Sequence, residues 1–313
     1  MEINNLTKSL AKINFLKKIN IFSKLNFNAA RKAIIEKIKT VKIEDKKAER
    51  AIKIVGLSRK EERPKSIDYI NGIFDDFIEL SGDRLSGNNN AIIAGLGSLG
   101  SITCAVLGYN KGKDLKERIE YNFGMPDPSG YRKSKRIMEI ANRFKFPVIT
   151  FVDTPGANPA IEAEDSGQAS AIAYNIEYMF KLEVPVIVVL IGEGGSGGAL
   201  ALSIGNYIMM LENSTYSVIS PEGCAAILWK DQAAVKEAAS ALKLTASDLF
   251  SMGIIDRIIK EPIGGAHNNS ERTIYIVKKH ILKKLYELIN INGAELKKAR
   301  AEKFEKIGFY KNV

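Results

Sequence analysis

The sequence predicts an α/β protein with a largely parallel sheet, from two observations. Short apolar runs rich in β-branched residues, such as 146–152 and 184–191, alternate with longer segments whose apolar residues recur at helical spacing. The run that opens at Val184 ends in five glycines around one serine at 192–198, and then becomes rich in Ala and Leu. This order predicts a buried strand, a tight loop and the start of a helix.

The overall composition is that of an ordinary globular chain with enough length for a sizeable core. It has 313 residues, of which 45% are hydrophobic and 26% charged. No run approaches the roughly 18 apolar residues that span a bilayer, so we expect no membrane span. Cys104 and Cys224 are the two cysteines, and each lies in an apolar stretch. We therefore expect no cysteine zinc site, and buried reduced thiols that suit a cytoplasmic compartment.

The positive charge is concentrated at the N-terminus. Residues 1–50 hold 13 Lys and Arg against 5 Asp and Glu, whereas the whole chain carries a net charge of +10. A basic arm of this kind binds nucleic acid, an anionic membrane or an acidic partner, or is simply a solvated helical face. Lysines interrupt its apolar residues too often for a secretory signal. A targeting segment for a plastid-type organelle stays open.

The first elements expected along the chain are helical. Apolar residues recur at helical spacing within 8–53, which predicts one or two peripheral amphipathic helices. Arg63 precedes a proline and marks a break. The spacing then predicts a helix over 67–80, with Gly82 near its C-cap.

A hairpin and a short helix are expected next. The apolar runs 91–96 and 101–107 flank a glycine-containing turn, which predicts a β-hairpin. A loop over 108–112 and a short helix over 114–122 follow. The two prolines and four other turn residues of 124–130 argue against helix there.

From residue 131 onward, helical and strand patterns alternate. β-Branched and apolar runs predict strands at 146–152, 184–191, 207–211, 217–219 and 254–259. Helical spacing predicts helices at 131–144, 167–180, 199–204, 233–241, 246–252 and 271–292, before a basic helical tail. The Pro155-Gly156 pair within 153–157 predicts a turn after the first of these strands.

Three kinds of chemistry fit the glycine-rich segment. Gly194-x-Ser196-x-Gly198 matches a nucleophile elbow, and Asp256 and His267 follow in the order that a hydrolase triad uses. A phosphate cradle is disfavoured, because the segment lacks the lysine and the glycine spacing of nucleotide loops. The third interpretation uses the backbone: the amides of Gly197 and Gly198 at a helix start would bind an oxygen that develops negative charge.

Longer motifs, in the glycine-rich segment and elsewhere in the chain, resemble those of one protein family. GEGGSGGALA at 192–201 and STYSVISPEGCA at 214–225 resemble signatures of the carboxyltransferase alpha subunits of bacterial-type, multi-subunit acetyl-CoA carboxylase. Shorter motifs resemble the same family in the same order over 63–267, namely RP at 63–64, GDR at 82–84, NFGMP at 122–126, GYRK at 130–133, DTPGA at 153–157 and EPIGGAH at 261–267.

The resemblance implies a crotonase-like ββα superhelix with helical extensions at both ends. We therefore predict three parts: a basic helical N-terminal extension at 1–62, a crotonase-like carboxyltransferase domain at 63–270, and a C-terminal helical tail at 271–313. The implied reaction transfers a carboxyl group from carboxybiotin, supplied in trans by a carrier protein, to acetyl-CoA, giving malonyl-CoA for fatty-acid synthesis.

The resemblance also implies partners. They are the carboxyltransferase beta subunit in an α2β2 assembly, the biotin carboxyl carrier protein and biotin carboxylase. The chain has no lysine between two methionines for biotin attachment, and its two cysteines cannot form the zinc ribbon of the beta subunit. We expect it to bind no metal or covalent cofactor and to be catalytically incomplete alone.

The family's functional residues are carried over by motif. The amides of Gly197 and Gly198 are expected to form an oxyanion hole for the ureido oxygen of biotin. The expected substrate and carboxybiotin contacts are Gly194, Gly195, Gly156, Ala157, Lys111 and Gly112. Several positions depart from the family pattern near this side of the site: Tyr109, Asp127, Ser129, Asn158, Ala160 and Ser166.

Two other functions stay open at this point. One is a carboxyltransferase or decarboxylase component acting on another acyl-CoA, with acyl specificity set by the beta subunit. The other is a nucleic-acid-binding or scaffold protein with a decayed site, which the basic residues 1–50 suggest.

Overall fold

The computed structural model describes residues 2–19 and 27–308, and a twisted mixed sheet forms the centre of this part of the chain. The strand order is β1-β2-β3-β4-β5-β6-β8, and β7 pairs with the end of β5. β1, β2 and β3 are antiparallel, and the remaining pairs are parallel. The strands are β1 Asp75–Glu79, β2 Ile92–Leu99, β3 Ile102–Tyr109, β4 Val148–Thr154, β5 Val186–Gly195, β6 Tyr207–Leu211, β7 Thr215–Ser217 and β8 Arg257–Ile259.

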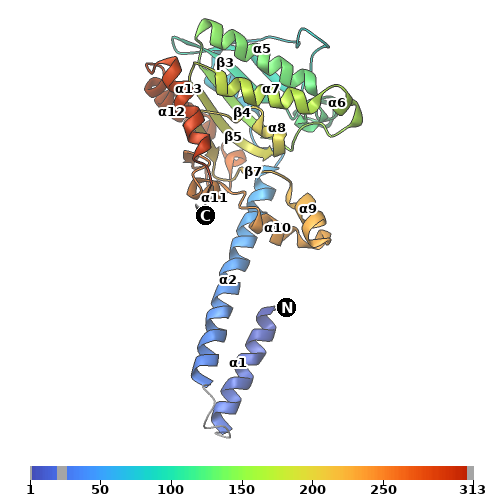
Figure 1. Cartoon of the computed structure of the whole chain (residues 1–313), viewed down its shortest axis with the longest axis vertical. Helices are drawn as coiled ribbons and strands as arrows, with labels where there is room; N and C mark the ends of the chain where they lie inside the picture. The colour runs from blue at the N-terminus through green and yellow to red at the C-terminus, as the bar shows by residue number, and fades with distance from the viewer. Residues whose placement is uncertain (1, 20–26, 309–313) are drawn as a thin grey trace.

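Helices cover both faces of the sheet, which explains the unbroken apolar runs in its central strands. In β5, Val186, Val188 and Leu190 face the core beneath α5 (Pro128–Phe144) and α7 (Gln168–Lys181). The alternate residues Ile187, Val189 and Ile191 face a second core with α3 (Ser66–Ile73) and α12 (Ser270–Leu288). Figure 1 shows α5 and α7 side by side over the sheet.

Shorter helices connect these layers. They are α4 Leu115–Glu120, α6 Ile161–Asp165, α8 Ser196–Leu200, α9 Pro221–Cys224, α10 Val235–Ala241, α11 Ala246–Ser251 and α13 Gly293–Glu305. Single helical turns lie at Asn122–Gly124, Ala225–Trp229, Gln232–Ala234 and Ala266–Asn268.

The N-terminal residues form a helical hairpin that projects from the body (Figure 1). α1 (Glu2–Ile19) packs against the outer part of α2 (Phe27–Ser58). The inner end of α2 joins the body, where Ala51 and Val55 pack against Ala239 and Leu244. Among the described residues, no helix combines the length and the apolar character needed to cross a membrane.

A buried arginine holds the C-terminal helix α13 to the body. The guanidinium of Arg300 donates to the carbonyl oxygens of Met179, Leu182 and Val184 at 2.6–2.8 Å, and to Asn206 Oδ1 at 2.6 Å. These carbonyls lie at the end of α7 and in the turn before β5, so one side chain satisfies a turn that would otherwise be buried without donors.

The predicted helix over 67–80 is wrong in its second half. The helix ends at Ile73, Phe74 is extended, and Asp75–Glu79 forms the edge strand β1. Gly95 on β2 makes this pairing possible, because a Cβ there would lie within 2.9 Å of the Ile78 carbonyl carbon. The apolar spacing of this short segment suits either structure, and tertiary pairing decides it.

Other boundaries also differ. α5 begins at Pro128, a favoured first helical residue, so the end of the predicted non-helical segment 124–130 is helical. β2 continues through Gly97, and the hairpin turn is only Gly100-Ser101. The predicted strand at 217–219 lies at Thr215–Ser217. The patterns did not predict α6, α9 or the turn at Ala225–Trp229.

Candidate functional site

The glycine-rich segment is strand and helix with no loop between them. β5 runs through Gly195, because its last residues pair with β7 on one side and Gly194 pairs with Thr154 of β4 on the other. α8 begins at the next residue, Ser196, whose φ of 54° makes the turn. The predicted tight loop is therefore wrong. β5 ends at Gly195, and the first turn of α8 follows without a loop at the carboxyl edge of the sheet.

Most of these glycines are required by close backbone or side-chain neighbours. A Cβ at Gly192 would lie 2.6 Å from Asp153 Cγ. At Gly195 it would overlap the Pro155 carbonyl, and at Gly198 it would lie 2.5 Å from the Gly156 carbonyl carbon and closer still to Ala157 N. The turn at 153–157 thus lies directly against the glycine segment, which explains glycine on both.

Gly197 is different, because the space beside it is open. A Cβ there would meet only Ile172 Cγ2, at 3.8 Å. Gly197 instead lines a mostly apolar cavity of about 320 Å³. The other lining residues come from α8, the β7 region, α11 and neighbouring turns: Ser196, Leu200, Tyr216, Ser217, Val218, Leu242, Leu249, Met252 and Ile254.

The first turn of α8, which lies beside this cavity, contains backbone N–H groups that can donate hydrogen bonds. The N–H groups of a first helical turn have no acceptor within their own helix, which leaves the amides of Gly197 and Gly198 available. The carbonyl of Gly197 accepts from Ala201 N at 3.0 Å. The buried hydroxyl of Tyr109 donates to the carbonyl of Gly198. Both glycines are therefore held by their carbonyls while their amides stay free of intrahelical bonds.

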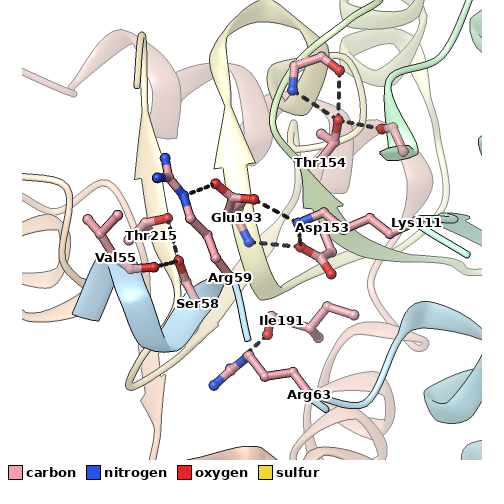
Figure 2. A network of polar contacts seen from close by, with 12 residues as sticks. Val55, Ser58, Arg59, Arg63, Lys111, Asp153, Thr154, Ile191, Glu193 and Thr215 are labelled. Carbon is pink, nitrogen blue, oxygen red and sulfur yellow. Dashed lines mark hydrogen bonds and ion pairs between the residues drawn. The ribbon is translucent and has the colours of Figure 1, made fainter. Parts of the chain in front are cut away.

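The turn bearing Gly156 and Ala157 is fixed by one threonine (Figure 2). Thr154 Oγ1 lies 2.6 Å from the Gly124 carbonyl oxygen and 2.7 Å from that of Gly156, and it accepts the Gly156 N–H at 3.1 Å. Gly156 has a φ of 156°, which favours glycine. The structure thus brings the predicted site residues Gly156, Ala157 and Gly198 together.

Lys111 lies in a buried cluster of charges rather than in a solvated loop (Figure 2). Its Nζ lies 2.7 Å from Asp153 Oδ1 and 2.8 Å from Glu193 Oε2, and its side chain is 12% exposed. Burial opposes the charged form, but the two carboxylates outweigh it and raise the pKa of Lys111. Asp153 Oδ1 also accepts the Glu193 N–H at 2.9 Å, so this cluster fixes both strands leading into the site.

An arginine from α2's C-terminal flank completes the cluster. Arg59 Nε donates to Glu193 Oε1 at 2.7 Å, and Arg59 Nη1 donates to Glu222 Oε1 of α9 at 2.6 Å. Desolvation would raise the pKa of Glu193, but Lys111 and Arg59 lower it below its ordinary value. Sequence reasoning did not find Arg59. A carboxylate inside a glycine run, Glu193, was the one signal that a cation must lie nearby.

Gly112, the other predicted contact on this loop, has a local role. Its φ is 75°, and a Cβ there would lie 2.6 Å from Arg118 N. The glycine therefore lets the chain turn tightly against α4.

The hydrolase triad is wrong. Asp256 precedes β8, and its carboxylate accepts the N–H of Ile208 at 2.7 Å at the amino end of β6. Ser196 follows the carboxyl end of β5, which is parallel to β6 and β8. Asp256 and Ser196 therefore lie at opposite edges of the sheet, and Asp256 pairs with Lys303 instead.

Two of the departures from the family pattern contact each other. Asn158 Nδ2 donates to Asp127 Oδ1 at 2.6 Å, and Asn89 Nδ2 donates to the other Asp127 oxygen at 2.9 Å. Gln168 Nε2 donates to the Asn158 carbonyl at 3.0 Å. This polar group ties the 153–158 turn to the start of α5.

Comparisons with solved structures identify the fold. The fold matches a malonate decarboxylase hetero-tetramer from Pseudomonas with a TM-score of 0.61 and 14% identity, covering 76% of this chain and 92% of that one. It matches transcarboxylase 12S with a TM-score of 0.58 and 17% identity, covering 72% of this chain and 42% of that one. This chain therefore spans less than half of the transcarboxylase chain. The fold is that of the crotonase-like carboxyltransferases, as the resemblance predicted.

Sequence comparison gives the family. The chain belongs to the acetyl co-enzyme A carboxylase carboxyltransferase-like family, whose model matches residues 1–308. It is 53% identical to the acetyl-coenzyme A carboxylase carboxyl transferase subunit alpha of Geobacter sulfurreducens, over 81% of this chain and 79% of the relative. It is 50% identical to the same subunit of Clostridium botulinum strain Alaska E43, over 81% of this chain and 93% of the relative.

Proposed function

We propose that this chain is the alpha half of a carboxyltransferase that, with a beta subunit, moves a carboxyl group from carboxybiotin to acetyl-CoA and yields malonyl-CoA. One observation carries the assignment of the site. Two glycine amides at the first turn of α8, one open to a cavity and one pressed against the 156–157 backbone, form a fixed pair of donors. Fixed donors of this kind stabilise charge that develops during reaction.

The cavity beside Gly197 fits the biotin side of this reaction. Its volume of about 320 Å³ and its mainly apolar walls suit a small fused ring with one polar edge. The amides of Gly197 and Gly198 would take the ureido oxygen, which gains negative charge when the carboxyl group leaves. Gly156 and Ala157 hold Gly198 in place, and Gly194 and Gly195 shape the strand that leads into the turn. Carboxybiotin itself supplies the activated carboxyl group and arrives on a carrier protein.

A second oxyanion site is needed for the enolate of acetyl-CoA, and we assign it to the beta subunit. Family membership already implies such a partner. Exposed apolar side chains support a protein partner on this part of the chain: Val218, which lines the cavity, is 78% exposed, and Ile227 and Leu228 are 65% and 70% exposed. The proposal includes the α2β2 assembly, the biotin carboxyl carrier protein, biotin carboxylase and a reducing, cytoplasmic setting, which the two buried free cysteines suit.

The test is carboxyl transfer in reverse. The chain is mixed with its cognate beta subunit, malonyl-CoA and a biotin derivative, and acetyl-CoA release is followed. Release that requires both chains and the biotin derivative supports the proposal. Release that is independent of biotin would instead identify a decarboxylase, and a formed complex that acts only on another acyl-CoA would correct the substrate.

A second candidate activity is nucleic-acid binding by the basic N-terminal arm, which the projecting hairpin of α1 and α2 favours (Figure 1). Binding through phosphate contacts would weaken steeply with salt. Replacing the exposed Lys12, Lys32, Lys42 and Lys46 with glutamine should then reduce the salt slope. Nucleic-acid binding that is unchanged in this variant, or absent at physiological salt, would contradict a nucleic-acid-binding role for the N-terminal arm.

A further inference from the structure

Tyr109 is the last residue of β3, and its side chain reaches the candidate site from the core. The residue is 1% exposed and packs in the same apolar cluster as α5, α7 and α8. Its hydroxyl donates to the carbonyl oxygen of Gly198.

The contact bears on Gly198, one residue of the donor pair. Gly198 has no Cβ, and α8 is only five residues long, so its own helix gives weak support. On one side the backbone of Gly156 and Ala157 presses against Gly198. On the other side the Tyr109 hydroxyl fixes its carbonyl. Gly198 is thus clamped between a backbone surface and a buried donor.

We propose that Tyr109 is a positioning residue for the oxyanion donors of α8, acting through the Gly198 carbonyl without touching substrate. This inference rests on the proposed function of the Gly197 and Gly198 amides. A preorganised donor stabilises the transition state because it need not move during reaction, so a loosened Gly198 should lower turnover more than substrate binding.

The hydroxyl is suited to this role at all working pH values. Burial raises the pKa of Tyr109 well above its ordinary value, and the neighbouring Tyr131 and Tyr216 add to the shift. Tyr109 therefore stays protonated and remains a donor to the carbonyl. Removal of the oxygen alone, as in Tyr109→Phe, keeps the ring that fills the core.

The test compares Tyr109→Phe with Tyr69→Phe in the reverse reaction with the beta subunit. Tyr69 is equally buried, lies in the opposite core, and its hydroxyl has no hydrogen-bond partner within residues 2–19 and 27–308. We expect kcat of Tyr109→Phe to fall about tenfold with KM within about twofold, since loss of a whole donor costs roughly 10²–10³. Tyr69→Phe should keep both constants.

A second readout does not depend on activity. Hydrogen exchange of the peptide covering α8 should speed up in Tyr109→Phe and stay unchanged in Tyr69→Phe. Unchanged exchange in α8, an unchanged kcat, or a rise in KM alone would each overturn the positioning role. If the wild-type pair releases no acetyl-CoA, the proposed function fails, and faster exchange in α8 would still show that the hydroxyl holds the turn.

Discussion

Gly198→Ala should lower activity far more than Gly197→Ala, although the two residues are adjacent. A Cβ at Gly198 would lie 2.5 Å from the Gly156 carbonyl carbon and 3.0 Å from Gly156 Cα. Carbon atoms in contact are normally about 3.5–4.0 Å apart, so the two backbones must separate by roughly 1 Å. A Cβ at Gly197 meets only Ile172 Cγ2 at 3.8 Å, which is ordinary contact.

The magnitude follows from that displacement. A misplacement of about 1 Å can cost on the order of 10²-fold in rate, and removal of one oxyanion donor about 10²–10³-fold, or roughly 2.7–4 kcal/mol. We expect Gly198→Ala to lose activity in this range, and Gly197→Ala to stay within about fivefold of wild type, because its amide remains in place. The larger Gly197→Val should fall further by filling the cavity.

The assay is acetyl-CoA release from malonyl-CoA with the beta subunit and a biotin derivative, at saturating beta subunit. Thermal unfolding of each variant serves as the control for global damage. Equal losses for the two alanine variants would refute the argument from backbone contact. So would full activity of Gly198→Ala in a variant whose sequence is verified.

Three further predictions concern buried charges. Lys111→Met leaves the Asp153 and Glu193 carboxylates without their shared cation, so urea unfolding should show a loss of about 3–5 kcal/mol. Lost activity at full stability would instead place Lys111 against substrate. Burial lowers the pKa of Lys133 to about 8, below its unfolded value near 10.4, so the unfolded state binds more protons between these pH values. Stability relative to Lys133→Met should therefore rise from pH 8 to pH 10 by about 2 kcal/mol, and a flat difference in Tm would contradict this. Arg300→Ala leaves buried carbonyls without donors and should cost about 3 kcal/mol, with faster protease cleavage in α13 than in wild type. Unchanged cleavage would show that other contacts hold α13.

The sequence predicts the centre of the fold well, because strands that are buried on both faces consist of continuous apolar runs. The runs at 146–152 and 184–191 overlap the central strands β4 and β5, and α5, α7 and α12 follow from their periodicity. β1 was missed because an edge strand is defined by its neighbour, here the space left by Gly95. The three-part division of the chain stays a prediction.

Side-chain partners distant in sequence were the hardest part of the site to predict. Arg59 and Glu193 are 134 positions apart, and the local sequence around either residue does not indicate that the two form an ion pair. Lys111 was predicted as a contact for substrate, whereas the structure gives its ammonium two carboxylate partners. Spacing along the chain reports faces of helices and strands, and only the folded sheet brings the ends of α2, β3, β4 and β5 together.

The glycines of 192–198 have two different structural causes, close packing and access to the cavity, and the motif alone does not separate them. Gly192, Gly195 and Gly198 are glycines because the turn at 153–157 lies too close for any side chain. That demand would exist in a chain with no catalytic role, so these glycines are in themselves evidence of packing. Gly197 has room for a methyl group, yet lines the cavity. The chemistry therefore depends on where the turn holds the two amides, and the close packing around Gly198 is the means by which the fold keeps those amides still.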